Sequence, residues 1–443
     1  MHKFILTIAG GGSTYTPGIV KSLLAKKEDF PLKELRLYDN DGGRQEKVAI
    51  IVKEVVKELA PELPVVTTTD PETAFTGAEF IFAQMRVGKN AMRELDEKIP
   101  LRYGVVGQET CGPGGLAYGL RTIYPMAELI DLVEKYANPK HWIVNYSNPA
   151  AVVAEAMKIL RPNARIINIC DMPVATIRNM AAVIGEDRNK LVVDYFGLNH
   201  FGWFTKITVD GVDRTDEIRQ HAIKHGLLVE DMAKVDAQHS DPSWIKNWKN
   251  IQYMMEMFPD YIPNPYLQYY LLGDSIVEHT DVNHTRANEV MEGREKRLFD
   301  AVNEYNRTGE VDLSSFYTGV HGQFIVDVAM SLAYNLRKRF LVMVENKGAV
   351  MNLPEDAMVE IPAYITSDGP EPIRVGKIPT FFKALIEQQY AVEKLIVEAA
   401  IEHSYEKALM SLTLSRTVPS AFKAKEILDE LIKANKGFWP ELN

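Results

Sequence analysis

The stretch IAGGGSTY, residues 8–15, decides the fold of this chain. It ends a mostly apolar run, Lys3–Ala9, that predicts a β-strand, and it precedes Pro17, a residue that suits the first turn of a helix. Glycines at such a strand–turn–helix junction allow a tight turn, and the helix N-terminus then offers N–H groups to a pyrophosphate. The sequence therefore predicts a dinucleotide-binding turn. Its candidate cofactor contacts are Gly10, Gly11, Gly12, Ser13 and Thr14.

The next predicted strand supports NAD as the bound nucleotide. This strand, Glu34–Tyr38, is followed by Asp39, which stands at a suitable distance along the chain to bond an adenosine ribose hydroxyl. Asp39 would repel a 2′-phosphate, which favours NAD over NADP, although Arg44 lies nearby. Tyr15 departs from the usual fingerprint because it occupies the third glycine position. The alternative is a plain strand–helix turn, which would not need three successive glycines.

Outward from this turn, short apolar runs alternate with amphipathic stretches through the first 200 residues. The predicted strands are Lys3–Ala9, Glu34–Tyr38, Glu79–Gln84, His141–Tyr146, Arg165–Ile169 and Leu191–Gly197. The predicted helices between them include Arg44–Leu59, Tyr118–Tyr136 and Pro149–Leu160. Strands that alternate with helices form right-handed crossovers and a mostly parallel sheet. The fold class is therefore α/β, with a Rossmann-type doubly wound sheet.

The second half of the chain has a different pattern. Residues 205–280 are irregular, strong helices follow at Thr285–Asn303 and Pro379–Leu409, and a β-rich insert, Leu341–Tyr364, lies between those helices. No long flexible linker separates the halves, so we expect them to pack closely. The predicted division is a nucleotide-binding domain, residues 1–200, and an α+β substrate domain, residues 201–443, with the active site shared between the two.

Composition excludes several classes of protein. The chain has 443 residues, a net charge of −10 and no basic stripe, which argues against nucleic acid as a partner. No run approaches the ~18 consecutive apolar residues of a membrane span, and the N-terminus lacks a signal-peptide pattern. Two cysteines in so long a chain are not a disulfide framework. We therefore expect a cytoplasmic enzyme without a membrane partner.

Cys170 and His200 form a candidate metal pair. Each follows a predicted strand, Arg165–Ile169 or Leu191–Gly197, and doubly wound sheets bind ligands at C-terminal strand ends. A thiolate and an imidazole there can hold a divalent cation with positions left open for substrate. Cys111, in a glycine-rich turn, is a rival ligand by the same reasoning. The alternative is a buried cysteine that acts as a small apolar residue and a histidine bonded to nearby backbone.

Several motifs, taken in order, resemble glycoside hydrolase family 4. They are GGGSTYTPG (10–18), MRELDEKIPLRYGVVGQETCGPGG (92–115), NYSNPA (145–150), ICDMP (169–173), GLNHFGW (197–203), NHTRANEVMEGRE (283–295) and VENKGAVMNLPEDAMVEIP (344–362). The family comprises NAD- and metal-dependent glycosidases with a fold related to lactate and malate dehydrogenases, often as homodimers or homotetramers. The CDMP sequence of this chain, residues 170–173, is similar to that of the 6-phospho-α-glucosidases of the family, which cleave maltose 6′-phosphate to glucose 6-phosphate. A CNVP form would indicate 6-phospho-β-glucosidases.

The resemblance also implies roles for individual residues. Those that match the metal ligands, usually of Mn²⁺, are Cys170 and His200. Those that match catalytic groups are Asp171, the proton donor to the leaving group, Tyr266, the base, and Glu109, which raises the reactivity of that tyrosine. Those that match contacts to the phosphorylated disaccharide are Arg93, Asn148 and Arg286. The planar guanidinium of arginine suits the oxygens of a 6-phosphate.

Each of these side chains also has a purely structural interpretation. Asp171 and Asn148 precede prolines at expected helix starts, where such residues commonly cap the helix. Arg93 lies in a charged run that suits a solvated helix face, and Arg286 can form an i,i+3 surface pair with a glutamate. Tyr266 belongs to an aromatic cluster in which most members must be packing residues.

The mechanism that the family implies proceeds through oxidation and elimination, an exception among glycosidases. NAD⁺ takes a hydride from C3 of the sugar, and the resulting ketone acidifies the proton on C2. A base removes that proton, elimination expels the protonated C1 oxygen, water adds, and the hydride returns. Two alternatives remain: a hydroxy-acid dehydrogenase, which needs no metal pair and produces NADH, and a regulatory nucleotide-binding protein with an inactive site.

Overall fold

A nine-stranded sheet forms the centre of the molecule. The computed structural model describes residues 2–232, 242–317 and 319–443. Within these residues the strand order is β13-β12-β11-β6-β5-β4-β1-β2-β3, and the six strands from the first half pair in parallel. Those six are β1 (Phe4–Ala9), β2 (Leu32–Tyr38), β3 (Val65–Thr68), β4 (Phe80–Ala83), β5 (Trp142–Asn145) and β6 (Ile166–Asn168). The predicted doubly wound parallel sheet is confirmed.

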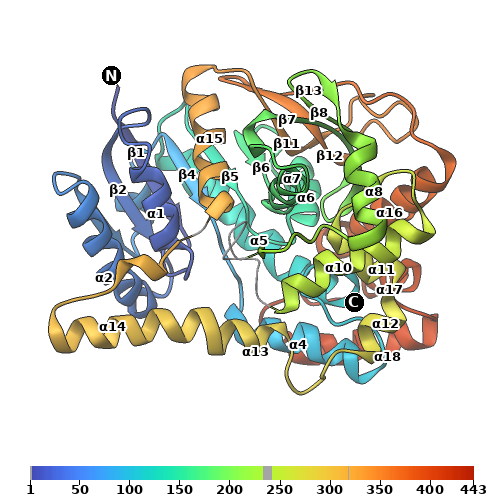
Figure 1. Ribbon diagram of the computed structural model, residues 1–443. Coiled ribbons are helices and arrows are strands. Elements are labelled where there is room, and N and C mark those ends of the chain that lie inside the picture. Colours follow the sequence, from blue (N-terminus) through green and yellow to red (C-terminus); the bar gives the residue numbers. More distant parts are fainter. Residues whose placement is uncertain (1, 233–241, 318) are drawn as a thin grey trace.

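The sheet separates two apolar cores because consecutive strand residues face opposite sides. In β4, Phe80 and Phe82 join one core, whereas Ile81 and Ala83 join the other. Helices cover both faces, as the alternating pattern predicted (Figure 1). Those of the first half are α1 (Thr16–Leu24), α2 (Gly42–Leu59), α3 (Pro71–Phe75), α4 (Lys89–Arg102), α5 (Gly112–Tyr136), α6 (Ala150–Leu160) and α7 (Met172–Val183).

The second half completes the same sheet. Its antiparallel strands are β11 (Lys338–Glu345), β12 (Met358–Thr366) and β13 (Gly369–Pro372), and β11 pairs with β6. These strands correspond to the β-rich insert expected at Leu341–Tyr364. The two halves therefore share one sheet, and the close packing expected from the absence of a linker is observed.

The prediction for Leu191–Gly197 needs correction. This run forms β7 (Leu191–Leu198), which pairs in an antiparallel hairpin with β8 (Phe201–Val209) in a separate small sheet together with β9 (Val212–Asp213) and β10 (Ile262–Pro263). His200 therefore lies in a hairpin turn, with φ of 64°, and not at the end of a parallel strand. An apolar run has the same composition in either sheet, so the sequence could not distinguish them.

Two predicted long helices are interrupted. The run Thr285–Asn303 comprises α13 (Arg286–Val290), a π-helical turn (Met291–Glu295) and α14 (Lys296–Thr308). The run Pro379–Leu409 is split into α16 (Thr380–Glu402) and α17 (Tyr405–Leu414), because His403 has φ of 56° and Ser404 caps α17.

The segment expected to be irregular, residues 205–280, contains further helices where it is described. They are α8 (Thr215–His225), α10 (Pro242–Met257), α11 (Gln268–Leu271) and α12 (Gly273–Glu278). The remaining helices of the second half are α15 (Gly319–Tyr334) and α18 (Ala421–Ala434). In Figure 1, α14 lies beside α2 and α15 lies beside α1. Helices of the second half therefore pack against the two helices that flank β2, close to the glycine turn. Among the described residues no helix is long and apolar enough to span a membrane.

Candidate active site

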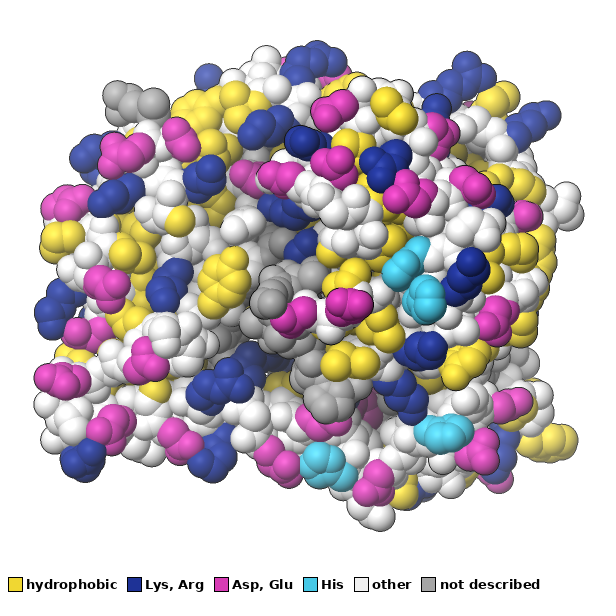
Figure 2. Space-filling view, in the orientation of Figure 1, with side chains coloured by type: hydrophobic (Ala, Val, Ile, Leu, Met, Phe, Trp, Pro, Cys, Tyr) yellow, Lys and Arg dark blue, Asp and Glu magenta, His cyan; other side chains and the backbone are white. Residues whose placement is uncertain are grey.

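A large cleft lies between the two halves of the chain. Its volume is about 2160 Å³, and residues from the glycine turn to α15 line it. Figure 2 shows a hollow near the middle of this face, with Lys and Arg side chains beside it. All of the sequence-predicted site residues except Gly11 line this cleft.

The glycine turn is shaped by close backbone contacts. Gly10 has φ of 91°, and a Cβ atom there would lie 2.7 Å from the backbone oxygen of Gln84. The backbone N–H of Gly12 donates to the Asp39 carboxylate at 2.8 Å, and Arg44 donates to the backbone oxygen of Gly12 at 2.8 Å. The turn therefore needs glycine for steric reasons and opens on the cleft beside Asp39, so the residues fit a dinucleotide.

Cys170 and His200 meet at the other side of the cleft. The sulfur of Cys170 lies 3.3 Å from His200 Nε2, and Thr110 Oγ1 lies 3.1 Å from His200 Nδ1. Burial lowers the pKa of His200 to about 4, so its ring is neutral at pH 7, the form that binds metals. Burial also raises the pKa of the Cys170 thiol.

The pair fits a divalent cation that also binds substrate. Neither cysteine is in a disulfide, and within the described ranges no group of three or more His, Cys, Asp or Glu side chains forms a closed cage. Two protein ligands leave coordination positions for substrate oxygens. The rival ligand, Cys111, stands immediately before α5 and lies 3.9 Å from Thr110 Oγ1. The ring nitrogens of His200 contact the side chains of Cys170 and Thr110, whereas the structural alternative expected a histidine bonded to nearby backbone.

Tyr266 stacks on His200. The two ring centroids are 3.9 Å apart and the planes differ by 13°, so the phenol is beside the Cys170–His200 pair. Burial raises the pKa of Tyr266 well above 10, and the charge of Glu109 adds to this effect. The tyrosine thus lies beside the candidate metal pair, and a phenol with a raised pKa is a strong base once it is ionised.

Asp171 lies next to Cys170 at the start of α7. Although it occupies the N-cap position, its side chain makes no capping hydrogen bond, so the capping interpretation is wrong. One carboxylate oxygen of Asp171 lies 3.0 Å from Nδ1 of His321, a residue of α15 that the sequence did not single out. The contact brings together residues from the two halves of the chain.

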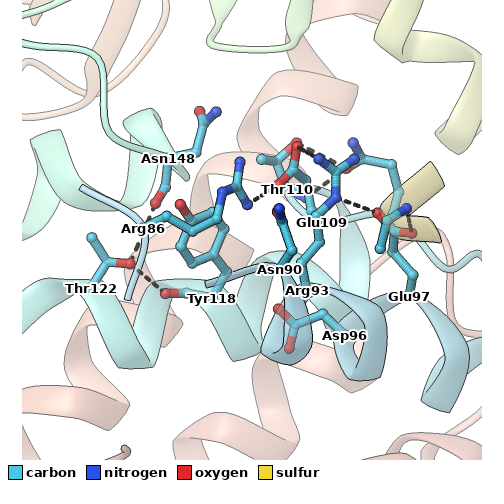
Figure 3. Close-up of polar contacts among 12 residues, drawn as sticks. Arg86, Asn90, Arg93, Asp96, Glu97, Glu109, Thr110, Tyr118, Thr122 and Asn148 are labelled. Atoms are coloured by element: carbon cyan, nitrogen blue, oxygen red, sulfur yellow. Dashed lines mark hydrogen bonds and ion pairs between the residues drawn. The ribbon is translucent and has the colours of Figure 1, made fainter. Parts of the chain in front are cut away.

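A buried cluster of charges surrounds Glu109 (Figure 3). Arg93 bonds Glu97 at 2.7 Å and lies 3.3 Å from Glu109, while Arg86 forms an ion pair with the same Glu109 carboxylate. Burial alone would raise the pKa of Glu109, but Arg86 and Arg93 outweigh it and lower that pKa to about 2. Arg93 is buried, so the expectation of a solvated face is wrong.

Asn148 and Arg286 both line the cleft. α6 begins after Pro149 and has no side-chain cap, so Asn148 does not cap it. Arg286 forms the i,i+3 ion pair with Glu289 at 2.6 Å that the sequence suggested, and it lines the cleft as well.

Sequence reasoning missed Arg86, Arg294 and His321. Arg86 follows β4, and the rule that ligands bind after parallel strands could have indicated it. The guanidinium of Arg294 lies 4.0 Å from the ring centroid of Tyr15, so it faces the glycine turn from the π-helical segment. His321 carried no local signal, because only the tertiary fold brings α15 to Asp171.

Two features open on one cleft of this doubly wound fold: a glycine turn suited to a dinucleotide and a Cys–His pair suited to a metal. Together they define a nucleotide- and metal-dependent enzyme. Models of two family domains match the chain: the family 4 glycosyl hydrolase domain over residues 5–186 and its C-terminal domain over residues 195–418. The chain therefore belongs to glycoside hydrolase family 4.

Similar proteins are described as 6-phospho-α-glucosidases. Maltose-6′-phosphate glucosidase MalH of Clostridium acetobutylicum is 50% identical, with 100% of both chains covered. The structure of a 6-phospho-α-glucosidase from gut microorganisms in complex with NAD and glucose 6-phosphate is 56% identical, with a TM-score of 0.98 and 100% of both chains covered. A second such enzyme from gut microorganisms, in complex with NAD and Mn²⁺, is 44% identical, with a TM-score of 0.95 and 100% of both chains covered.

Proposed function

We propose that this chain hydrolyses 6-phospho-α-glucosides such as maltose 6′-phosphate, releasing glucose 6-phosphate, and that it requires NAD and a divalent cation, Mn²⁺. The observation that carries the proposal is that the Cys170–His200 pair, Tyr266 and Asp171 open on the same cleft as the glycine turn. The CDMP motif and the names of the similar proteins support the α-anomer and the phosphorylated substrate.

The chain's own residues divide the binding of cofactors between the two sides of the cleft. The residues that would hold the dinucleotide are Gly10, Gly12, Ser13, Thr14 and Asp39, which line the cleft. Cys170 with His200 would hold the cation. When bound, NAD supplies reversible oxidation of the sugar, and the cation supplies a Lewis acid that offsets the raised pKa of Tyr266. Both functions need groups that no side chain provides.

Tyr266 and Asp171 then move the two protons. The phenolate of Tyr266 takes the proton from C2 of the sugar, which the neighbouring ketone has made acidic. The Asp171 carboxyl gives a proton to the departing C1 oxygen. Nδ1 of His321 lies 3.0 Å from that carboxyl. Glu109 increases the basicity of Tyr266 and stays ionised because Arg86 and Arg93 neutralise it.

Arg93, Asn148 and Arg286 are proposed to contact the substrate, with the arginines at its phosphate. We expect Arg93→Ala to raise KM for p-nitrophenyl α-glucoside 6-phosphate by about 10- to 100-fold, because a charge-assisted hydrogen bond contributes ~1.5–3 kcal/mol. Steady-state kinetics measures this effect. Arg102→Ala, at the exposed end of the same helix, is the control and should leave KM unchanged. Wild-type activity that is equal on the unphosphorylated glucoside would contradict the phosphate assignment.

Glu109 gives a pH dependence of stability. Folding lowers its pKa from 4.5 to about 2, so the stabilisation by its ionised form is complete above pH 4.5 and is lost as pH falls towards 2. The shift corresponds to a free energy on the order of 3 kcal/mol. Urea unfolding should therefore show wild type and Glu109→Gln converging between pH 5 and about pH 3. A difference that stays constant over this range would contradict the assigned ion pairs.

The substrate class is tested with a panel of p-nitrophenyl glucosides, assayed with NAD⁺ and Mn²⁺. The panel contains α- and β-anomers, each with and without a 6-phosphate. Of these four glucosides, we expect only the phosphorylated α-anomer to release nitrophenol. Preference for the phosphorylated β-anomer would overturn the anomeric assignment, and preference for an unphosphorylated glucoside would overturn the substrate class.

We further propose a homodimer or homotetramer, a cytoplasmic location and a functional division near residue 200. A reducing compartment keeps the Cys170 thiol available for metal, because an oxidised sulfur cannot bind it. Light scattering of the purified protein measures the oligomeric state, and a monomer would contradict this part of the proposal.

A further inference from the structure

The motif VENKGAVMNLPEDAMVEIP, residues 344–362, contributes a buried carboxyl that the proposed chemistry does not use. Glu360 lies in β12 with no solvent-exposed surface, between the buried apolar residues Val359 and Ile361. A buried carboxyl is costly unless its oxygens are hydrogen-bonded, and an apolar residue would pack at this position without that cost. The role of Glu360 therefore depends on the hydrogen bonds that its two oxygens make.

One oxygen of Glu360 holds the hairpin that carries His200. Its Oε1 accepts a hydrogen bond from Nδ2 of Asn199 at 3.1 Å. Asn199 directly precedes His200, whose φ of 64° is unusual for a residue other than glycine. Such a conformation persists only when the surrounding structure determines it. The hydrogen bond from Asn199 to Glu360 of β12 helps to fix this backbone conformation beside the metal pair.

The other oxygen of Glu360 reaches the turn that carries Tyr266. Its Oε2 accepts from the hydroxyl of Tyr195 at 3.2 Å, and Asn264 Nδ2 donates to that hydroxyl at 3.4 Å. Asn264 Oδ1 in turn accepts from the backbone N–H of Tyr266 at 3.0 Å. The side chains of Tyr195 and Asn264 are buried, so water does not compete for these bonds.

The two branches end at rings that touch. His200 and Tyr266 stack at 3.9 Å, and their backbones belong to different segments, the β7–β8 hairpin and the turn after β10. A change of a fraction of an ångström in either segment would alter this contact. Both segments are joined to one carboxyl on a strand of the large sheet.

We propose that Glu360 is a positioning residue that fixes the hairpin of His200 and the turn of Tyr266 relative to each other. It does so through Asn199 on one side and through Tyr195 and Asn264 on the other. The inference rests on the proposed function, because it assigns metal binding to His200 and proton transfer to Tyr266. It adds that a residue of the large sheet is needed to keep the metal ligand and the base of the cleft in register.

Three variants separate the two branches. Glu360→Met removes both, whereas Glu360→Gln keeps an oxygen for Asn199 and an amide that can donate to Tyr195. Tyr195→Phe removes only the branch to Tyr266. Glu155→Met is the control, because Glu155 is another buried carboxyl, on α6, whose ion-pair partner is Lys158. Circular dichroism establishes that each variant is folded before it is assayed.

The first readout is the affinity for Co²⁺, measured by the thiolate-to-cobalt absorption band and thus independent of any substrate. Glu360→Met should weaken it by about 10- to 100-fold, the usual effect of losing a group that orients a metal ligand. Glu360→Gln, Tyr195→Phe and Glu155→Met should stay within about threefold of wild type, because they keep the Asn199 bond. The second readout is kcat, which should fall in Glu360→Met and Tyr195→Phe while KM changes little.

The outcomes distinguish this inference from the proposed function. Folded Glu360→Met with wild-type Co²⁺ affinity and kcat would overturn the positioning role and leave the proposed function intact. Loss of both properties to the same extent in Glu155→Met would also overturn it, since the effect would then be general to buried carboxyls. A wild-type protein that gives no cobalt–thiolate band would overturn the proposed metal site itself, and the inference with it.

Discussion

Replacing Cys170 by serine is expected to lower kcat by at least about 1000-fold, because a metal ion contributes several kcal/mol of transition-state stabilisation and each ~1.4 kcal/mol is a factor of ten. A neutral serine hydroxyl is a much weaker metal ligand than a thiolate, so the variant should also lose Co²⁺ binding. The sulfur is 3.3 Å from His200 Nε2, and the substitution changes one atom within a buried site. Steady-state kinetics at saturating Mn²⁺ and NAD⁺ measures the loss.

Cys111→Ser is the matched control for this prediction. Cys111 is buried as well, and it lies near Thr110, whose hydroxyl contacts both Cys111 and His200. We expect this variant to keep its Co²⁺ band and most of its activity. If Cys111→Ser loses the band and Cys170→Ser keeps it, the metal ligand has been assigned to the wrong cysteine.

Tyr266→Phe should lower kcat by about 100- to 10,000-fold, the range expected when a positioned general base is removed. The aromatic ring that stacks on His200 at 3.9 Å is retained, so Co²⁺ affinity and the free energy of unfolding should change little. The combination of lost turnover and retained metal binding would identify the hydroxyl as the group that acts on the substrate.

Tyr269→Phe provides the comparison within the same cleft. Its ring lies 5.6 Å from that of Tyr266, and burial raises its pKa in the same direction. We expect activity within about fivefold of wild type, since Tyr269 has no assigned proton to move. Equal losses in the two variants would show that the cluster acts through packing alone.

The parallel part of the fold could be predicted because its signals are local. In β1, a buried apolar strand runs directly into a turn whose Gly10 requires a positive φ, and both features are visible in residues 3–15. The split between α16 and α17 was missed because the helical pattern continues through His403, which adopts a conformation that the sequence gives no reason to expect. Only Ser404, a good N-cap residue, was a signal for the new helix.

The site could be predicted in part. Cys170 was indicated by its place after a parallel strand, but His200 was placed for an incorrect reason, since its hairpin belongs to another sheet. The charged run around Arg93 suits a solvated helix face, because the second partner of Arg93, Glu109, lies outside that run. Glu360 was hidden in an ordinary buried strand, because its importance depends on contacts with residues 161 and 165 positions away.

The most direct test of the central claim is nitrophenol release from p-nitrophenyl α-glucoside 6-phosphate by protein stripped of nucleotide and metal. NAD⁺ and Mn²⁺ are then added separately and together, while absorbance at the nicotinamide band is followed. The account predicts release only with both additions and no net formation of NADH. Release with neither would indicate an ordinary two-carboxylate glycosidase, and steady accumulation of NADH would indicate a dehydrogenase. Either result would contradict the account.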